Sequence, residues 1–223
     1  MPFILNIETS SAICSVCLAK DGVLVDYQED SQGNSHARVL TVFIEALMQK
    51  NNFAFADLDA VAISAGPGSY TGLRIGASVA KGLCYAVNKP LIAVPTLLSL
   101  AGGMLKKVND PSAAYMPALD ARRMDIYTAV FDAHGNEMIS TRAVTVNSVL
   151  KAELEHFEKL FIAASGAEKC KEILKSPGIH FMDGITCDAR LLIPISEARA
   201  NNRQFEDMAY FEPYYLKEFG AKT

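Results

Sequence analysis

The order of apolar and polar positions along the chain occurs twice. Each half begins with three short apolar runs between polar corners, which predict strands, and continues with a 3.6-residue pattern, which predicts a helix. A buried strand then ends in a glycine that leads into another helix. The expected strands of the two hairpin regions are 3–7, 13–19 and 23–27 in the first half and about 115–120, 124–131 and 139–146 in the second. The chain is thus predicted to contain two similar βββαβα units.

The first long helix of each half is indicated by a stripe of apolar side chains. In the first half the stripe consists of Val39, Leu40, Phe43, Ile44 and Leu47. Ser35 is the predicted N-cap of this helix, because a serine hydroxyl can accept from the first unpaired backbone N–H groups. Residues 147–160 occupy the same place in the second half. Glycine turns at Asp21-Gly22 and Gly135-Asn136 are predicted to close the two hairpins.

Two such units predict an α/β protein with an N-terminal lobe, residues 1–105, and a C-terminal lobe, residues 106–223. The last segment of the chain has room to pack back on the first lobe. This arrangement resembles the actin-like (ASKHA, ribonuclease H-like) two-lobed fold of actin, hexokinase, acetate kinase and the Hsp70 nucleotide domain. Ligands of open α/β sheets bind beyond the carboxyl ends of the strands. We therefore expect the polar corners and glycine loops of both lobes to face one cleft.

Composition narrows the class of protein. Half of the 223 residues are hydrophobic and 21% are charged, which is typical of a soluble globular protein. A net charge of −4 argues against a broad nucleic-acid surface, although a partner could bind nucleic acid. Five cysteines without framework spacing fit a reducing compartment, and the pair Cys14 and Cys17 has no second pair to form a zinc site. We expect a cytoplasmic protein without a membrane segment.

The segment AISAGPGSYTGLRIGASVAKG, residues 62–82, joins a predicted strand to a predicted helix through a glycine loop. Gly66 and Gly68 let the backbone approach a ligand closely, and Ser69 or Thr71 could cap the helix, whose N-terminus attracts anions. The loop is not a P-loop, because the G-x-x-x-x-G-K-[ST] pattern is absent. A phosphate-binding loop and a purely structural turn are both compatible with these residues.

Beyond the loop, Gly72, Gly76 and Ala80 recur every four residues and so share one helix face. Small residues on a helix allow another backbone to come very close. Close packing could offset the cost of about 1 kcal/mol for glycine inside a helix. The partner could be an element of the same lobe or another subunit, and we expect the latter.

Four motifs together closely resemble the TsaB (YeaZ) family: ILNIETS, SHARVL, AISAGPGSYTGLRIGASVAKGL and LDARRMDIY. The resemblance extends from residue 3 to EPYYLKEF near the C-terminus. It implies a non-catalytic subunit that forms a heterodimer with its catalytic paralogue TsaD. With the ATPase TsaE, the pair would transfer a threonylcarbamoyl group to the adenosine beside the anticodon of tRNA. The resemblance further implies a homodimer when the chain is alone, and contact with tRNA only through the complex.

The resemblance also implies that this chain lacks the metal site of TsaD. The two metal-binding histidines of that paralogue align with Thr96 and Leu100, neither of which is a good ligand. We therefore expect no catalytic residue, no metal and no cofactor in this chain. His36, at the start of a helix, is interpreted as an interface residue rather than a base. Glu8 departs from the family, which usually has aspartate there.

Two sets of candidate site residues follow. The resemblance places the partner interface on two helical segments, 36–48 and 72–87. The predicted interface residues are His36, Val39, Leu40, Phe43, Leu47, Gly72, Ile75, Gly76, Val79, Ala80 and Leu83. The candidate nucleotide or partner contacts lie in the polar corners and the glycine loop: Glu8, Thr9, Ser10, Gly66, Gly68, Ser69, Asp120, Arg122 and Arg123. For the Asp120 corner, an exposed turn with a salt bridge and a partner contact both remain open.

Two other functions are compatible with the fold. A free-standing small-molecule kinase or ATPase would use the glycine loop and the polar corners. Against this function, the chain lacks metal ligands, and its small second lobe leaves little room for a substrate domain. An M22-type protease would need a metal, and no H-E-x-x-H motif occurs. Turnover of ATP by the purified chain, or stoichiometric zinc or iron in it, would favour these alternatives.

Overall fold

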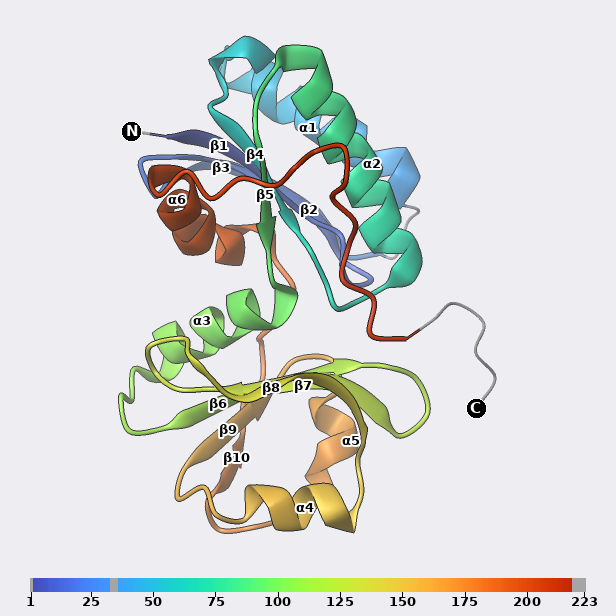
Figure 1. Cartoon of the computed structure of the whole chain (residues 1–223), viewed down its shortest axis with the longest axis vertical. Helices are drawn as coiled ribbons and strands as arrows, with labels where there is room; N and C mark the ends of the chain where they lie inside the picture. The colour runs from blue at the N-terminus through green and yellow to red at the C-terminus, as the bar shows by residue number, and fades with distance from the viewer. Residues whose placement is uncertain (1, 33–35, 218–223) are drawn as a thin grey trace. The chain divides into compact units, whose positions relative to one another are not determined.

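The computed structural model describes residues 2–32 and 36–217 (Figure 1). Contacts divide the chain into two compact units. The first runs to residue 96 and also contains residues 187–215; the second contains residues 97–186 and the described residues 216 and 217. Relative to lobes divided at residue 105, residues 97–105 therefore belong to the second unit and 187–215 to the first. No helix among the described residues has the length and apolar character needed to cross a membrane.

The first unit contains a five-stranded mixed sheet with the strand order β3-β2-β1-β4-β5. Its strands are β1 (Phe3–Glu8), β2 (Cys14–Lys20), β3 (Val23–Asp30), β4 (Ala60–Ser64) and β5 (Leu91–Val94). β1 pairs antiparallel with β2 and parallel with β4. Strands β1, β4 and β5 are buried along their whole length, as expected for central strands that read as continuous apolar runs.

Helices cover both faces of this sheet (Figure 1). α1 (His36–Lys50) and α2 (Tyr70–Val87) pack on one face, where Leu40, Ile44 and Leu47 meet the odd-numbered side chains of β1. The opposite face is covered by η2 (Ala189–Leu192) and α6 (Ile193–Asn201), with Leu192 against Ile4 and Ile92. A short turn of helix, η1 (Phe55–Asp57), precedes β4.

The second unit repeats this plan. Its sheet has the order β10-β9-β6-β7-β8, with β6 (Ala114–Asp120), β7 (Asp125–Phe131), β8 (Glu137–Thr145), β9 (Leu160–Ala163) and β10 (Ile179–Phe181). α4 (Ser148–Leu154) and α5 (Ala167–Lys171) pack with it into a second core, and α3 (Thr96–Val108) joins the two sheets along the chain. The predicted repeat of βββαβα units is confirmed, and each unit adds a fifth strand. Common descent of the two halves stays a prediction.

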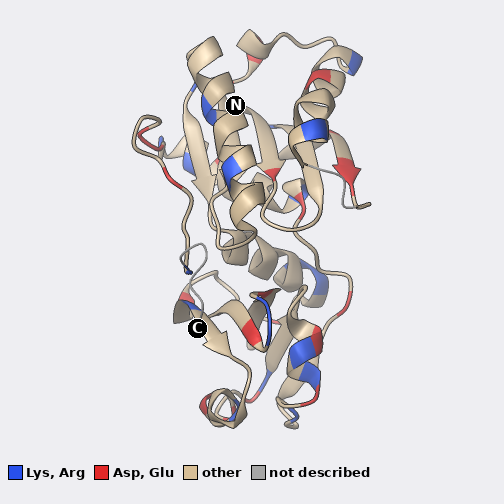
Figure 2. Ribbon diagram, turned by 90° about the vertical axis from the view of Figure 1, so that its right-hand side faces the viewer, with Lys and Arg blue, Asp and Glu red and all other residues tan. Residues whose placement is uncertain are grey.

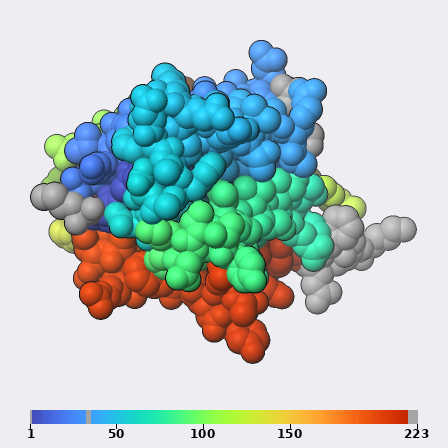
Figure 3. Space-filling view, turned by 90° about the horizontal axis from the view of Figure 1, so that it is seen from above, coloured from blue at the N-terminus to red at the C-terminus, as the bar shows by residue number. Residues whose placement is uncertain are grey.

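The residues after α6 form a strap along α2 within the first unit. Glu206 forms a bridge to Leu91, and the Lys81 ammonium donates to the carbonyl oxygens of Ala209 (3.4 Å) and Phe211 (3.2 Å). In Figure 3 this C-terminal chain (red) lies at the surface beside green residues of the first unit. The strap then reaches the glycine loop, because the Tyr214 N–H donates to Ala65 O at 2.7 Å.

Candidate functional site

The glycine loop lies between β4 and α2, next to the polar corner that follows β1. Ser69 caps α2 as predicted: its hydroxyl accepts from the Gly72 N–H at 3.2 Å. Asn88, in the left-handed region with φ 52°, ends the helix. Ser35, the predicted cap of α1, lies outside the described residues.

Three backbone N–H groups of this loop are bound within the protein. Ser69 N–H donates to Ser10 O at 2.6 Å, and Ala65 N–H donates to Val94 O at 2.8 Å. Gly66 N–H donates to the Thr96 hydroxyl at 3.1 Å. Since an anion site needs N–H groups that point at a ligand, these three donors contribute none. At these three positions the geometry therefore favours the structural interpretation of the loop.

Close packing explains the glycines of the loop. A Cβ at Gly66, where φ is +101°, would overlap the Tyr214 carbonyl, and one at Gly68 would overlap the Ser10 carbonyl. The space beside Gly66 is therefore occupied by the strap, and the space beside Gly68 is occupied by the β1–β2 corner. Any larger residue would push these segments apart. The loop thus serves to join three segments of the first unit.

The glycine stripe of α2 faces the same corner, not another subunit as we expected. A Cβ at Gly72 would overlap the Thr9 carbonyl, and one at Gly76 would overlap the Thr9 hydroxyl. Both glycines and Ala80 are buried within the unit. The reason is that the small side of the helix accommodates the backbone that leaves β1. The expectation that this stripe makes the subunit contact is therefore corrected.

Part of the predicted apolar stripe of α1 is also buried in the core of the first unit. Leu40 and Leu47 have no exposed surface, because they pack on β1 and β2. They belong to the core of the first unit and have no surface to offer a partner. His36, at the start of the helix, is partly buried and its Nε2–H donates to the Ser11 carbonyl at 2.9 Å.

The remaining predicted interface residues keep part of their surface in solvent. Val39, Phe43, Ile75, Val79 and Leu83 are partly buried hydrophobics at the edge of the core. On α2, Ile75 and Val79 are separated by one turn, and Gly82 follows at the spacing that keeps it on their side. Gly82 is exposed and has no atom within 4 Å of an added Cβ. We call Ile75, Val79, Gly82 and Ala86 the α2 outer face.

Gly82 is a residue that the sequence interpretation missed. In a helix interior glycine costs about 1 kcal/mol relative to alanine, and nothing in the monomer requires it here. The signal was available, because Gly82 stands seven residues after Ile75 and three after Val79. The sequence-based prediction instead placed the subunit contact on the more regular stripe that contains Gly72 and Gly76.

The corner after β1 is a buried polar cluster. Glu8 and Thr9 have no exposed surface and Ser10 is 2% exposed. The Glu8 Oε1 accepts the Ser10 N–H at 2.6 Å, whereas its Oε2 and the Thr9 and Ser10 hydroxyls have no hydrogen-bond partner among the described residues. Burial raises the pKa of Glu8 above its ordinary value, and the hydrogen bond from the Ser10 N–H opposes this only in part.

A substitution at Glu8 tests this burial. In the unfolded chain the Glu8 carboxyl ionises near pH 4.5, whereas the buried carboxyl of the folded chain stays protonated to a higher pH. The free energy of unfolding therefore falls as the pH rises from 4.5 through the folded-state pKa. We expect Glu8→Gln to increase the free energy of unfolding at pH 8 and to lose this pH-dependent gain near pH 4, as measured by urea denaturation at both pH values. Glu172→Gln, at an exposed site, is the control and should show no such change. An equal effect of Glu8→Gln at both pH values would contradict a raised pKa.

The corner after β6 belongs to the second unit and differs in character. Asp120, Arg122 and Arg123 are exposed. Asp120 forms an ion pair with Lys169 at 2.8 Å, and Asp125 forms one with Lys217 at 2.6 Å. The exposed turn with a salt bridge that the sequence suggested is thus present.

The positions that align with metal ligands of the paralogue are occupied by core groups. The Thr96 hydroxyl accepts the Gly66 N–H, and Leu100 has no exposed surface. Within residues 2–32 and 36–217, no three His, Cys, Asp or Glu side chains gather in a way that could hold a metal ion. All five cysteines are buried and free, and burial raises the pKa of Cys14 and Cys187 to about 12.

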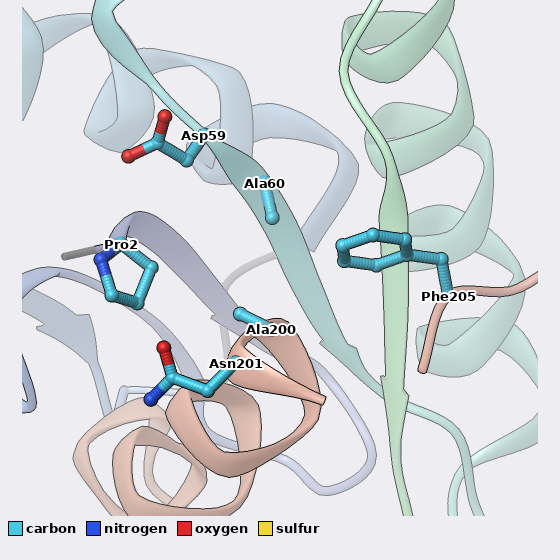
Figure 4. Close-up of a pocket in the computed structure, with 6 residues that line it drawn as sticks. All are labelled: Pro2, Asp59, Ala60, Ala200, Asn201 and Phe205. Atoms are coloured by element: carbon cyan, nitrogen blue, oxygen red, sulfur yellow. The ribbon is translucent and has the colours of Figure 1, made fainter. Parts of the chain in front are cut away.

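Among the surface pockets formed by described residues, two lie in the first unit. One lies near the start of β1, at the opposite end of that strand from the glycine loop, with Asp59 engaged by the Phe3 N–H at 2.7 Å (Figure 4). Its lining residues are Pro2, Asp59, Ala60, Ala200, Asn201 and Phe205. The other lies between α2 and the strap and is lined by Arg74, Ala77, Ser78, Lys81, Phe211, Glu212, Pro213 and Tyr215. Neither pocket includes the glycine loop.

Comparison with known proteins agrees with the family resemblance of the sequence. Residues 29–218 match the family model of TsaD, described as tRNA N6-adenosine threonylcarbamoyltransferase. The chain is 27% identical, over 96% of its length and 94% of the relative's, to the tRNA threonylcarbamoyladenosine biosynthesis protein TsaB of Escherichia coli. It is 32% identical to the Bacillus subtilis protein of that name over 57% of this chain and 54% of the relative.

Solved structures give the fold. YeaZ from Pseudomonas aeruginosa superposes with a TM-score of 0.82 at 23% identity, covering 97% of this chain and 100% of that one. A more distant neighbour is the activator of 2-hydroxyisocaproyl-CoA dehydratase from Clostridium difficile, with a TM-score of 0.53, 8% identity and coverage of 91% and 97%. With such neighbours, the expected actin-like fold class is confirmed.

Proposed function

Because the chain belongs to the TsaB (YeaZ) family of tRNA threonylcarbamoyladenosine biosynthesis proteins, which the TsaD family model matches, we propose that it is the non-catalytic subunit of the threonylcarbamoyltransferase complex. It forms a heterodimer with TsaD and helps to recruit TsaE. The partner supplies the metal, the nucleotide site and the chemistry of transfer to tRNA. This chain supplies a docking face that stabilises the partner.

The observation that carries this proposal is the α2 outer face. Ile75 and Val79 keep apolar surface in solvent, and Gly82 beside them leaves open space where a side chain would otherwise stand. A helix of a partner could approach such a surface to backbone distance and bury it. Val39 and Phe43 of α1 extend the apolar surface, since they pack at the edge of the same core.

The glycine loop supports the non-catalytic part of the proposal. Its donors at Ala65, Gly66 and Ser69 are bound to other segments of the protein. The buried Glu8 has a raised pKa, which favours its neutral form over the charged form that a magnesium ligand needs. A kinase would therefore have to bind phosphate without these three donors, and it would need a charged carboxylate at Glu8, where burial favours the neutral form.

In the absence of TsaD, the α2 outer face is expected to pair with a second copy of itself. A twofold axis through such a face makes a self-complementary interface. The homodimer and the heterodimer then compete for the same residues. Adding TsaD should therefore dissociate the homodimer.

Titration of the purified chain tests this function. We expect calorimetry and size-exclusion chromatography to give a 1:1 complex with TsaD, and no heat with ATP and magnesium for the chain alone. Transfer of threonylcarbamoyl to tRNA should require TsaD. Turnover of ATP or modification of tRNA by the chain alone would contradict the proposal, as would a failure to bind TsaD.

A further inference from the structure

One side of α2 carries the only charged residues of that helix, and both are basic. They are Arg74 and Lys81, and the helix contains no aspartate or glutamate. Ser78 lies between them and Tyr85 follows one turn after Lys81, so all four lie on the side of α2 next to the α2 outer face. In Figure 2, where Lys and Arg are blue and Asp and Glu are red, the ribbon of α2 bears no red. We call Arg74, Ser78, Lys81 and Tyr85 the α2 basic stripe.

Neither basic side chain of the stripe is paired with a carboxylate of the described residues. The Arg74 guanidinium lies 4.2 Å from the centroid of the Tyr70 ring, which packs against the Tyr215 ring of the strap at 4.9 Å. This contact occupies one face of the guanidinium, whereas the N–H donors point outward from its edge. The Lys81 ammonium donates only to two backbone carbonyls of the strap. Two positive charges thus lie together, without an ion pair, on a chain of net charge −4.

The stripe forms one wall of the pocket of about 290 Å³ between α2 and the strap. Phe211, Pro213 and Tyr215 of the strap supply its apolar wall. Glu212 also lines the pocket, but it is exposed and forms no ion pair with a described residue, so two positive charges face one negative charge. Pockets for drug-sized ligands begin at about 300 Å³. This pocket therefore suits one or two side chains of a partner better than a whole cofactor.

Two tyrosines beside the pocket are almost fully exposed. Tyr85 of the stripe is 81% exposed and Tyr210 of the strap is 84% exposed, the highest values among the exposed large hydrophobic side chains of the described residues. Lys81 donates to the carbonyl oxygens on both sides of Tyr210, which keeps this part of the strap next to the stripe. Tyrosine and arginine are enriched among the residues that dominate binding energy in protein interfaces. The surface therefore has the composition of a protein-binding site.

We propose that the α2 basic stripe and the strap bind an acidic segment of the partner protein, with a carboxylate of that segment paired with Arg74. This inference rests on the proposed function and deepens it, because the stripe borders the α2 outer face on which the partner docks. A carboxylate matches the planar fork of a guanidinium in a bidentate pair. The apolar outer face then provides most of the affinity, whereas the ion pair fixes the register of docking and speeds association.

Titration calorimetry and stopped-flow kinetics with TsaD, over a series of salt concentrations, test this contact. Arg74→Gln is expected to weaken binding roughly fivefold, chiefly through slower association, and to make the affinity less dependent on salt. Arg74→Lys keeps the charge without the planar fork and should retain part of the affinity. Glu212→Gln removes the one carboxylate among the residues that line the pocket, so it should tighten binding about twofold. Opposite effects at Arg74 and Glu212 are the signature of an acidic partner.

Arg203→Gln is the matched control for Arg74→Gln. Arg203 is another exposed arginine of the first unit, and its replacement changes the net charge by the same amount. The affinity for TsaD and its salt dependence should therefore stay those of wild type. The melting temperature of Arg74→Gln separates binding from folding, since loss of the contact with Tyr70 should lower it by about 3 °C or less.

The outcome distinguishes this inference from the proposed function. Formation of the wild-type pair with TsaD is measured first, and if no pair forms, the proposed function fails and this inference with it. If the pair forms and Arg74→Gln binds TsaD with the affinity and salt dependence of wild type, only this inference is overturned. An effect of Arg74→Gln confined to the homodimer, or to binding of ATP and magnesium, would also overturn it, because the pocket would then accept a second copy or a nucleotide.

Discussion

Gly72→Ala is expected to lower the free energy of unfolding by about 2 kcal/mol or more. The added Cβ would overlap the Thr9 carbonyl, a backbone atom in a corner that the Ser69–Ser10 hydrogen bond also fixes. Overpacking of a core typically costs about 1–3 kcal/mol, which exceeds the gain from replacing a helical glycine. For a chain of this size the melting temperature should fall by about 4–8 °C, as measured by calorimetry.

The same substitution at Gly82 is the matched control for Gly72→Ala. Gly82 lies in the same helix but has open space around its Cα. Gly82→Ala should therefore raise the free energy of unfolding by up to about 1 kcal/mol. Effects of the same sign at both positions would mean that the close approach of Thr9 to α2 is wrong. The comparison also explains why Gly76→Leu, which would overlap Thr9, is unsuitable as an interface test.

Gly82→Leu is expected to weaken the complex with TsaD by at least about 2 kcal/mol, which is roughly 30-fold in Kd. A leucine there would occupy the space that the partner helix requires on the α2 outer face. The folded chain should tolerate it, because the position is exposed and leucine favours helix. Titration calorimetry against TsaD measures the loss, and the melting temperature of the variant should equal or exceed that of wild type.

Gly102→Leu provides the control for this interface test. Gly102 is likewise an exposed glycine inside a helix, α3, with open space around it, but it lies in the second unit. Its affinity for TsaD should remain that of wild type. If Gly82→Leu also binds TsaD normally, the α2 outer face is not the docking face and the proposed interface fails with it. Val39→Asp is a weaker test, because Val39 packs partly against its own core.

The repeated order of strands and helices could be predicted because it depends on local patterns. Alternating apolar runs, glycine turns and helical stripes report the elements directly, and both hairpins formed where the sequence indicated. The cap at Ser69 was equally local. Family motifs then identified the fold class, since four separate segments carried the resemblance.

What each helix face meets could not be predicted in the same way. Periodicity shows that Gly72 and Gly76 share a face, but the group opposite them is Thr9, some 60 residues earlier in the chain. The use of the loop donors was hidden for the same reason, because Ser10 and Tyr214 approach the loop from distant segments. Nor does the sequence show that lysines 169 and 217 engage the aspartates of the corner after β6.

The discontinuous first unit has a consequence for synthesis of the chain. Ile4 and Ile92 are translated early, yet the helix that covers them is built around Leu192. On the ribosome, the second unit is nearly all made before that helix emerges, so the unit begun first is completed last. Until then one side of its sheet stays uncovered in the nascent chain, a surface for which chaperones would compete.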